Sequence, residues 1–403
     1  MRNNRPVDNL PAPVLVNTSA SYQKMMAHLA QSNLIALDTE SDSLYSYATK
    51  VCLLQISVLT DPVPAEAAPD AEPDWLAVTD YLVDPLRLSI DSLGRLMASD
   101  QVEVVMHAAE NDILTLHREA GFTFGRIFDT QLAARILGWS GVGLAPMLER
   151  EYGVISNKKM QRTNWGQRPL TPEQIAYAQV DSRYLLDLRA RLIRELSTAE
   201  RWDEAQEAFA LLAQGSHEDR PPTPRTVWSM KATRQVPYAR MGLLEELWLW
   251  REQEAERRDR PPFKILGDAV LIKLLEIEPT RREELANIPG LSEHLFRRYG
   301  DALIQAVRRG QSRPLPPLPN GNHDDPRLEG VVLARFDALR RWRTTTAQAR
   351  GVDPDIVFSN DILTQIALQA PTRPEDLLTL PAIGPWKAET YGPEVVKIVA
   401  RKN

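Results

Sequence analysis

Two carboxylates, Asp38 and Glu40, stand two residues apart at the end of the apolar run Leu34–Leu37. Polar residues bound this stretch on both sides, which predicts a short buried strand rather than a helix. Side chains alternate along a strand, so both carboxylates point the same way, about 7 Å apart. Two anions on one face repel each other and are costly to bury, and a divalent cation with hard oxygen ligands relieves both problems. A strand that runs into an acidic turn would have the same sequence, so the pair needs partners.

Two further acidic positions follow in the first half of the chain. Asp112 comes shortly after the predicted strand Val102–Met106, at the edge of a sheet where open α/β folds bind ligands. Tyr177 and Asp181 are four residues apart in a predicted helix, so they share a face. Each position alone also fits an ordinary helix-end or solvated side chain. An Asp-x-Glu strand end, an Asp after a later strand and a Tyr-x-x-x-Asp helix, in this order, form a much more specific pattern.

The elements that must position these residues predict an α/β domain. We expect strands at residues 14–16, 34–38, 51–59, 81–83 and 102–106, and a short segment of unassigned structure at 126–129. We expect helices at residues 18–29, 86–97, 109–119, from 130 onward, and at 171–196. The last helix has the clearest start, because Thr171 and Gln174 can form a capping box around Pro172 at the first helical position. Strands that first follow one another and then alternate with helices indicate a mixed sheet flanked by helices.

The composition is that of an ordinary globular chain, 43% hydrophobic and 25% charged over 403 residues. The single cysteine, Cys52, lies in an apolar run, which argues against a disulfide framework and a cysteine-rich zinc site. The N-terminal residues lack the apolar core of a signal peptide, and no apolar run approaches membrane-spanning length. We therefore predict a cytoplasmic protein without a membrane partner. Acidic side chains prevail in residues 1–220 and basic ones slightly in the remainder, where a polyanion could bind.

An internal repeat occupies the second half of the chain. Positions 92 residues apart match without a gap: Trp250 with Trp342, Pro262 with Pro354, Pro279-Thr280-Arg281 with Pro371-Thr372-Arg373, and Tyr299-Gly300 with Tyr391-Gly392. Residues 236–311 and 328–403 are therefore predicted to be two copies of one helical unit, here called the first and second repeat. A first domain is expected over residues 1–214, with linkers at 215–235 and at the Pro-rich 312–327. Residues 61–74, rich in Pro, Ala and acids, are expected to form a surface insertion.

With these residues in place, the chain resembles the DEDDy 3′→5′ exonucleases and, among them, the ribonuclease D family. The resemblance rests on Leu37-Asp-Thr-Glu40, His107-Ala-Ala-Glu-Asn-Asp112, Tyr177-Ala-Gln-Val-Asp181, Phe128–Ala133 and Lys158–Leu170. The two repeats resemble HRDC domains, so the similarity spans nearly the whole chain. It implies a ribonuclease H-like exonuclease domain, a mixed sheet flanked by helices, followed by two small all-α HRDC-like domains. Departures from the family pattern are the 61–74 insertion and Asn164, where the family often has Asp.

The resemblance implies a metal-dependent 3′→5′ exoribonuclease that releases nucleoside 5′-monophosphates during 3′ processing of tRNA precursors and other structured RNA. By the family's pattern, two Mg²⁺ or Mn²⁺ ions would be held by Asp38, Glu40, Asp112 and Asp181, with Asp38 bridging both. Tyr177 is too weak an acid for a convincing general base and would instead orient the attacking water. A DNA exonuclease of the same chemistry and a non-catalytic RNA-binding scaffold remain alternatives.

An RNA partner with a single-stranded 3′ end needs local basic and stacking groups beside an acidic site. The candidates for substrate binding are Gln55, Lys158, Gln161, Trp165 and Arg168. Two alternatives stay open: Trp165 could pack inward, and Gln55 could be an ordinary polar strand residue. His107 is expected to fix a turn rather than bind metal, because Mg²⁺ prefers oxygen ligands. No Gly-x-x-x-x-Gly-Lys-Ser/Thr loop is present, so no nucleotide cofactor is expected.

Overall fold

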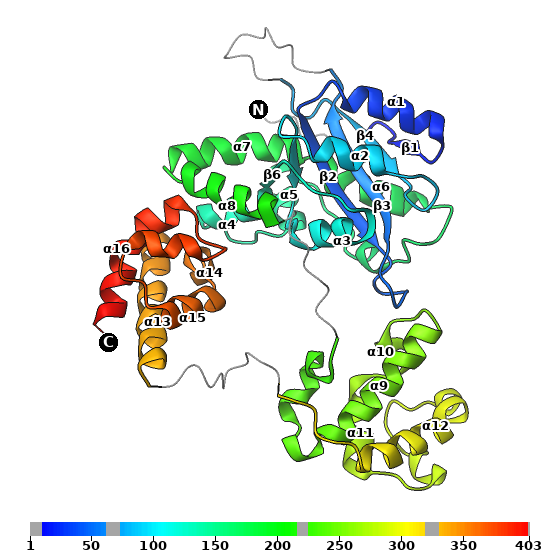
Figure 1. The fold of residues 1–403 in the computed structure, drawn as a ribbon. Coiled ribbons are helices and arrows are strands. Elements are labelled where there is room, and N and C mark those ends of the chain that lie inside the picture. The colour runs from blue at the N-terminus through cyan, green and yellow to red at the C-terminus, as the bar shows by residue number, and fades with distance from the viewer. Residues whose placement is uncertain (1–9, 62–72, 216–224, 319–329, 402–403) are drawn as a thin grey trace. The chain divides into compact units, whose positions relative to one another are not determined.

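A mixed six-stranded sheet organises the first domain (Figure 1). The computed structural model describes residues 10–61, 73–215, 225–318 and 330–401. The strands are β1 Val14–Val16, β2 Leu34–Ser41, β3 Val51–Leu59, β4 Val78–Val83, β5 Glu103–Met106 and β6 Arg126–Asp129. They lie in the order β1-β4-β3-β2-β5-β6; β3 is antiparallel to both neighbours, and the other pairs are parallel. The predicted mixed sheet is confirmed, with every predicted strand present.

Helices cover both faces of this sheet (Figure 1). The helices of the first domain are α1 Ser19–Leu29, α2 Asp91–Met97, α3 Glu110–Ala120, α4 Thr130–Leu137, α5 Leu144–Tyr152, α6 Pro172–Arg183, α7 Leu185–Thr198 and α8 Trp202–Gly215. The side chains of α1, α2 and α3 share one hydrophobic core with the sheet. Those of α4, α7 and α8 share another, and α6 lies across β2, β3 and β4.

The alternation of side chains along β2 decides where its carboxylates point. Ile35 and Leu37 belong to the core that contains α1, α2 and α3. Leu34 and Ala36 belong to the core on the opposite face, which contains α4, α7 and α8. The two carboxylates of β2 continue the even-numbered series, so they face the side on which α6 lies. The predicted period of two therefore places both acids on the same face of the sheet.

The predicted helix over residues 171–196 is in fact two helices. Its start is as predicted: the Thr171 side chain accepts from the Gln174 N–H at 3.2 Å, and the Gln174 side chain accepts from the Thr171 N–H at 3.0 Å. α6 ends at Arg183 and α7 begins at Leu185, with Tyr184 between them as a shared cap. The apolar pattern continues through this break, so helical periodicity does not reveal it.

The two repeats have matching helices. The first contains α9 Met241–Arg257, α10 Pro262–Ile265, α11 Asp268–Ile277 and α12 Glu293–Gln311. The second contains α13 Gly330–Arg350, α14 Pro354–Val357, α15 Asn360–Gln369 and α16 Pro385–Ala400. The short helices and their successors begin and end at positions 92 residues apart, which confirms the repeat. By its contacts, the second repeat forms one compact unit with the first domain, whereas the first repeat forms another unit with the loop Asp42–Lys50.

The predicted linkers and insertion are only partly described. Residues 62–72 of the insertion and residues 216–224 and 319–329 around the linkers lie outside the described residues. Part of the first predicted linker differs from expectation, because Val227 and Met230 are buried in the core of the first repeat. These residues belong to the short turns η3 Val227–Ser229, η4 Lys231–Gln235 and η5 Tyr238–Arg240. None of the helices in the described ranges has the length and apolar character needed to span a membrane.

Candidate active site

The predicted acidic residues line one cavity of about 580 Å³ at the end of β2. Asp38 and Glu40 come from β2, Asp112 from the first turn of α3, and Asp181 from α6. Tyr177, one helical turn before Asp181, lines the same cavity. Three segments that are far apart in the sequence therefore bring four carboxylates and a phenol to one place.

Asp129 and Thr39 fix the segment that carries Asp112. The Asp129 carboxylate accepts from the N–H groups of Ala108 and Ala109, at 3.1 and 2.8 Å, and from two N–H groups in the first turn of α4. The Thr39 hydroxyl donates to Asp112 Oδ1 and so joins β2 to α3. Neither residue was expected to have a role from the sequence alone. An Asp directly before a helix is an N-cap signal, which could have identified Asp129 as a positioning residue.

A buried ion pair holds α6 against the sheet. Arg183 Nη1 donates to Asp80 Oδ2 at 2.5 Å, and both side chains are buried. Gln179 Nε2 donates to Asp80 Oδ2 at 2.7 Å, and Ser57 Oγ donates to Asp80 Oδ1 at 2.7 Å. The network joins α6 to β3 and β4 immediately beside Asp181. It therefore sets how the last carboxylate of the site faces the other three.

Trp165 packs inward, as one of the two sequence alternatives proposed. Its side chain is 0% exposed, and its ring centroid lies 6.1 Å from that of Tyr177. The expected stacking face for a base is therefore not available at this position. Trp165 instead supports the ring of Tyr177, whose hydroxyl hydrogen-bonds to Gln161 and Asp181.

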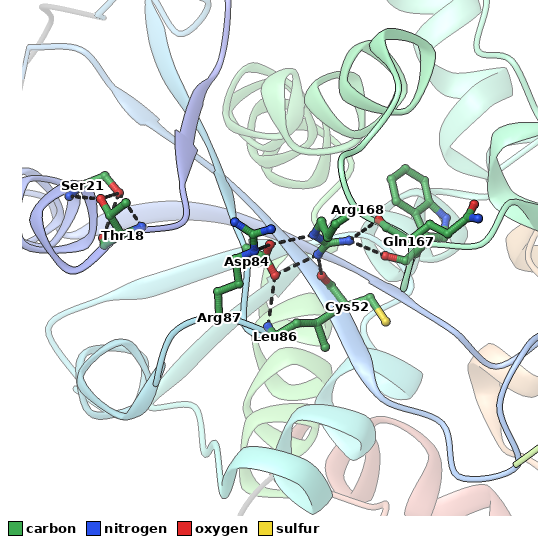
Figure 2. A network of polar contacts seen from close by, with 9 residues as sticks. Thr18, Ser21, Cys52, Asp84, Leu86, Arg87, Gln167 and Arg168 are labelled. Carbon is green, nitrogen blue, oxygen red and sulfur yellow. Dashed lines mark hydrogen bonds and ion pairs between the residues drawn. The ribbon is translucent and has the colours of Figure 1, made fainter.

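Arg168 is also a structural residue rather than a free cation (Figure 2). Its guanidinium binds the Asp84 carboxylate through Nε and Nη2, at 2.6 and 2.9 Å. It also donates to the carbonyl oxygens of Cys52, Trp165 and Gln167. These bonds use the donors that a phosphate would need, so the predicted contact with substrate does not fit. Arg168 anchors the segment that carries Trp165 onto the sheet.

The remaining predicted substrate residues fall into two classes. Lys158 and Gln161 are exposed and line the cavity of the carboxylates. Gln55 lies opposite Asp38 in the β2–β3 pairing but is 0% exposed, so it is not placed to contact a nucleotide. His107 lines the cavity, with Nδ1 2.9 Å from Thr130 Oγ1. Burial lowers the pKa of His107 to about 4, so its imidazole is neutral at neutral pH.

The four carboxylic acids of the cavity all have raised pKa values, because they are buried close to one another. Burial and the charges of the neighbouring carboxylates raise the pKa of Asp38 well above its ordinary value and that of Glu40 to about 9. Burial raises the pKa of Asp181 to about 8, against the opposing effect of the Tyr177 hydrogen bond. Burial raises the pKa of Asp112 to about 6, against the hydrogen bond from Thr39. The site therefore favours protons or cations over four free carboxylates.

The donor set fits hard divalent cations. Four carboxylates on one cavity supply only oxygen ligands and an excess of negative charge, which suits Mg²⁺ or Mn²⁺. In the part of the chain that is described, no three His, Cys, Asp or Glu side chains are already gathered around a single point. Asp38, Glu40, Asp112 and Asp181 are the residues that would hold the ions.

The raised pKa values predict how pH and metal affect stability. Without metal, the folded state holds protons on these carboxylates that the unfolded state releases near pH 4, so this contribution to stability falls as pH rises from about 4 to about 9. Mg²⁺ competes with those protons, so it should raise the melting temperature more at pH 8 than at pH 5.5. Thermal unfolding in EDTA and in Mg²⁺ measures both effects. An equal Mg²⁺ effect at the two pH values, or the same effect in Asp38→Asn, would contradict the assignment.

Comparisons with known proteins agree with this arrangement. A 3′-5′ exonuclease family model matches residues 13–197, and the HRDC domain model matches residues 240–307 and 332–399. Ribonuclease D of Nitrobacter hamburgensis is 28% identical over 94% of this chain and 93% of its own, and that of Acidiphilium cryptum is 27% identical over 98% and 95%.

Solved structures share the fold over nearly the whole chain. That of Escherichia coli RNase D has a TM-score of 0.65 at 21% identity and covers 97% of this chain and 99% of its own. A Bifidobacterium adolescentis protein has a TM-score of 0.75 at 19% identity, with coverages of 98% and 99%. The chain therefore has a 3′-5′ exonuclease domain followed by two HRDC domains, and it is similar along almost its full length to curated proteins of the ribonuclease D family.

Proposed function

We propose that the chain is a metal-dependent 3′→5′ exoribonuclease that releases nucleoside 5′-monophosphates from structured RNA with a single-stranded 3′ end, such as tRNA precursors. The convergence of Asp38, Glu40, Asp112, Asp181 and Tyr177 on one cavity carries this proposal. The curated relatives named ribonuclease D support it. The E. coli neighbour is described as an exoribonuclease involved in structured RNA processing, which motivates the substrate class. The cytoplasmic location expected from the sequence remains a prediction.

The chemistry assigns separate tasks to the carboxylates and the phenol. Two divalent ions held by the four carboxylates would polarise the scissile phosphate and lower the pKa of the attacking water. Tyr177 stays protonated, because burial and the charges of Asp181 and Glu40 raise its pKa above its ordinary value. It therefore orients the attacking water through a hydrogen bond to its hydroxyl oxygen, and does not act as a general base.

A second cavity extends the proposed path of the substrate. It has a volume of about 560 Å³ and shares Ala145, Pro146, Ser156 and Lys158 with the cavity of the carboxylates. Ile155 on its rim is 81% exposed and offers an apolar contact for a base. We place the 3′-terminal nucleotide in the first cavity and the preceding nucleotide in the second, with Lys158 between them as the partner of a phosphate.

The direct test uses single-stranded RNA and DNA of the same sequence, each labelled at its 5′ end. With Mg²⁺, RNA should shorten from its 3′ end, and mass spectrometry should detect nucleoside 5′-monophosphates. EDTA should stop the reaction. Faster cleavage of DNA would favour a DNA exonuclease of the same chemistry. No product from either polymer, with binding retained, would favour a scaffold.

Replacing Tyr177 by Phe tests the role of its hydroxyl. The ring would still pack on Trp165, so the fold should not change, but the water would lose one oriented partner. We expect kcat to fall by about a hundredfold, within the range of a positioned proton donor or acceptor. KM should change little, and single-turnover kinetics separates the two. An unchanged kcat would leave Tyr177 a packing residue only.

A further inference from the structure

The second repeat differs from the first at the positions where it contacts the first domain. The second repeat and the first domain belong to one compact unit, and their contacts involve α8 and the C-terminal end of α4. Ile356 of α14 is buried in the same hydrophobic core as α4, α7 and α8. Arg135 near the end of α4 donates to both carboxylate oxygens of Asp355, at 2.7 Å each.

The N-terminus of α16 is capped by a residue from another domain. Its N-cap residue is Gly384, which has no side chain to accept a hydrogen bond. The Glu207 carboxylate of α8 accepts from the backbone N–H groups of Trp386 and Lys387, the latter at 3.2 Å. A Cβ at Gly384 would lie 2.4 Å from the Glu207 carboxyl carbon, so any other residue at this position would displace the Glu207 carboxylate from its present place. Glu207 thus supplies the cap that α16 lacks.

In the first repeat, the helix at the equivalent position is capped by a residue of its own repeat. Ser292, 92 residues before Gly384, caps α12 with its own side chain, which accepts from the Leu295 N–H at 3.3 Å. An anion such as a phosphate group is favoured at a helix N-terminus. In the second repeat a carboxylate of the same chain already occupies that place.

Equivalent arginines of the two repeats also differ in this way: one binds an acid of its own repeat and the other an acid of the first domain. Arg258 in the first repeat binds Glu254 of its own helix, four residues earlier. In the second repeat the equivalent acid is replaced by Thr346, and Arg350 instead binds Glu204 of α8 through two guanidinium nitrogens. The Glu204 side chain is only 1% exposed, so the pair is largely removed from solvent.

Close backbone contact completes the interface. A Cβ at Gly138, the C-cap of α4, would lie 2.2 Å from the carbonyl oxygen of Gly351. Arg201, just before α8, donates to the carbonyl oxygens of Ile136 and Arg350, at 2.6 and 2.8 Å. The close approach of Gly138 to Gly351 and the bridging hydrogen bonds of Arg201 indicate a closely packed interface between the first domain and the second repeat.

We infer that the second repeat is a docking module, permanently held on α4 and α8 of the first domain, and that Glu207 closes its helix N-terminus to phosphate. The first repeat caps α12 with its own Ser292 and pairs Arg258 with its own Glu254, so RNA contact falls to this repeat. Two substitutions between the copies, Ser292/Gly384 and Lys264/Ile356, create interface positions, and a third, Glu254/Thr346, removes the partner within the helix that Arg350 would otherwise have. The inference uses no catalytic residue, so its failure would leave the proposed activity standing.

Hydrogen–deuterium exchange of the full chain, resolved to single amides, tests the docking. Glu207→Ala should speed exchange at Trp386 and Lys387 by about tenfold, the scale of a lost helix cap, and should also speed exchange across α8. The matched control is Ser292→Ala, which should speed exchange at Leu295 and leave α8 unchanged. Exchange at Trp386, Lys387 and α8 that stays at wild-type rates in Glu207→Ala would overturn the inference.

A second pair of variants tests the inference if Glu207→Ala unfolds the second repeat. Gly384→Ser gives α16 its own cap but places a side chain where Glu207 lies, so α8 should lose protection. The double variant Glu207→Ala/Gly384→Ser should regain slow exchange in α16 while α8 remains fast. Wild-type protection of α8 in Gly384→Ser would show that the contact does not hold the module, and would overturn the inference.

Discussion

The Asp38→Asn variant is expected to lose at least about a thousandfold in the rate of nucleotide release. The charges of Glu40, Asp112 and Asp181 all act on Asp38, which lines the same cavity. A two-ion site supplies several kcal/mol of transition-state stabilisation, and each 1.36 kcal/mol corresponds to a factor of ten. An amide at this position removes one anionic ligand without changing the shape of the side chain. Single-turnover cleavage of a labelled RNA oligomer in Mg²⁺ measures the loss.

A measurement of RNA affinity distinguishes a loss of catalysis from a loss of substrate binding. RNA affinity measured in EDTA should be nearly unchanged in Asp38→Asn, because without metal burial and the neighbouring carboxylates keep the Asp38 carboxyl protonated, and an amide of the same shape replaces it. Asp100→Asn makes the same change of charge at an exposed position outside the cavity, and it should cleave at the wild-type rate. Cleavage by Asp38→Asn within tenfold of the wild type would refute the assignment of the metal site.

Removing Arg183 should produce the largest loss of stability in the first domain. Arg183→Met leaves the Asp80 carboxylate buried without its counter-ion, although Ser57 and Gln179 still donate to it. Breaking one side of a buried pair costs about 3–5 kcal/mol. Native-state hydrogen exchange of amides in β3 and β4 reports the free energy of opening for this part of the chain, independently of the first repeat.

Two comparison variants distinguish the buried pair from an ordinary surface pair. Arg126 is 56% exposed in its contact with Glu103, so Arg126→Met should cost less than about 1 kcal/mol. The double variant Asp80→Asn/Arg183→Met should recover part of the loss, since no charge is then left unpaired. Equal losses in Arg183→Met and Arg126→Met would show that the network does not support α6 as described.

Local sequence signals predicted the strand ends and helix starts that carry the carboxylates. The period of two in β2 gave the direction of Asp38 and Glu40, and the capping box at Thr171 gave the start of α6. The partners of buried polar groups were not predictable in this way. Asp80 and Arg183 are 103 residues apart, and no local pattern joins them.

Long-range packing also explains the incorrect expectations. Trp165 and Arg168 lie in a basic, polar segment, which suggested a surface loop facing RNA. Their true environment depends on Asp84 and on the backbone of β3, both distant in sequence. The cap that Glu207 gives to α16 joins residues 180 positions apart and could not be read from either segment. Pairing across a fold is invisible to propensity and periodicity.

The burial of α6 has a consequence for how the enzyme fails. Eight of its twelve residues are buried, and they include polar ones on nearly every side, so α6 has no solvent-facing stripe. Such a helix derives its order from the surrounding sheet and from Trp165, not from its own amphipathicity. Thermal inactivation should therefore coincide with collapse of the surrounding sheet, with no long-lived folded but inactive form. A fragment truncated ahead of α7 would retain every catalytic side chain but lose the α7 and α8 side chains that pack on one face of the sheet, so it should be inert.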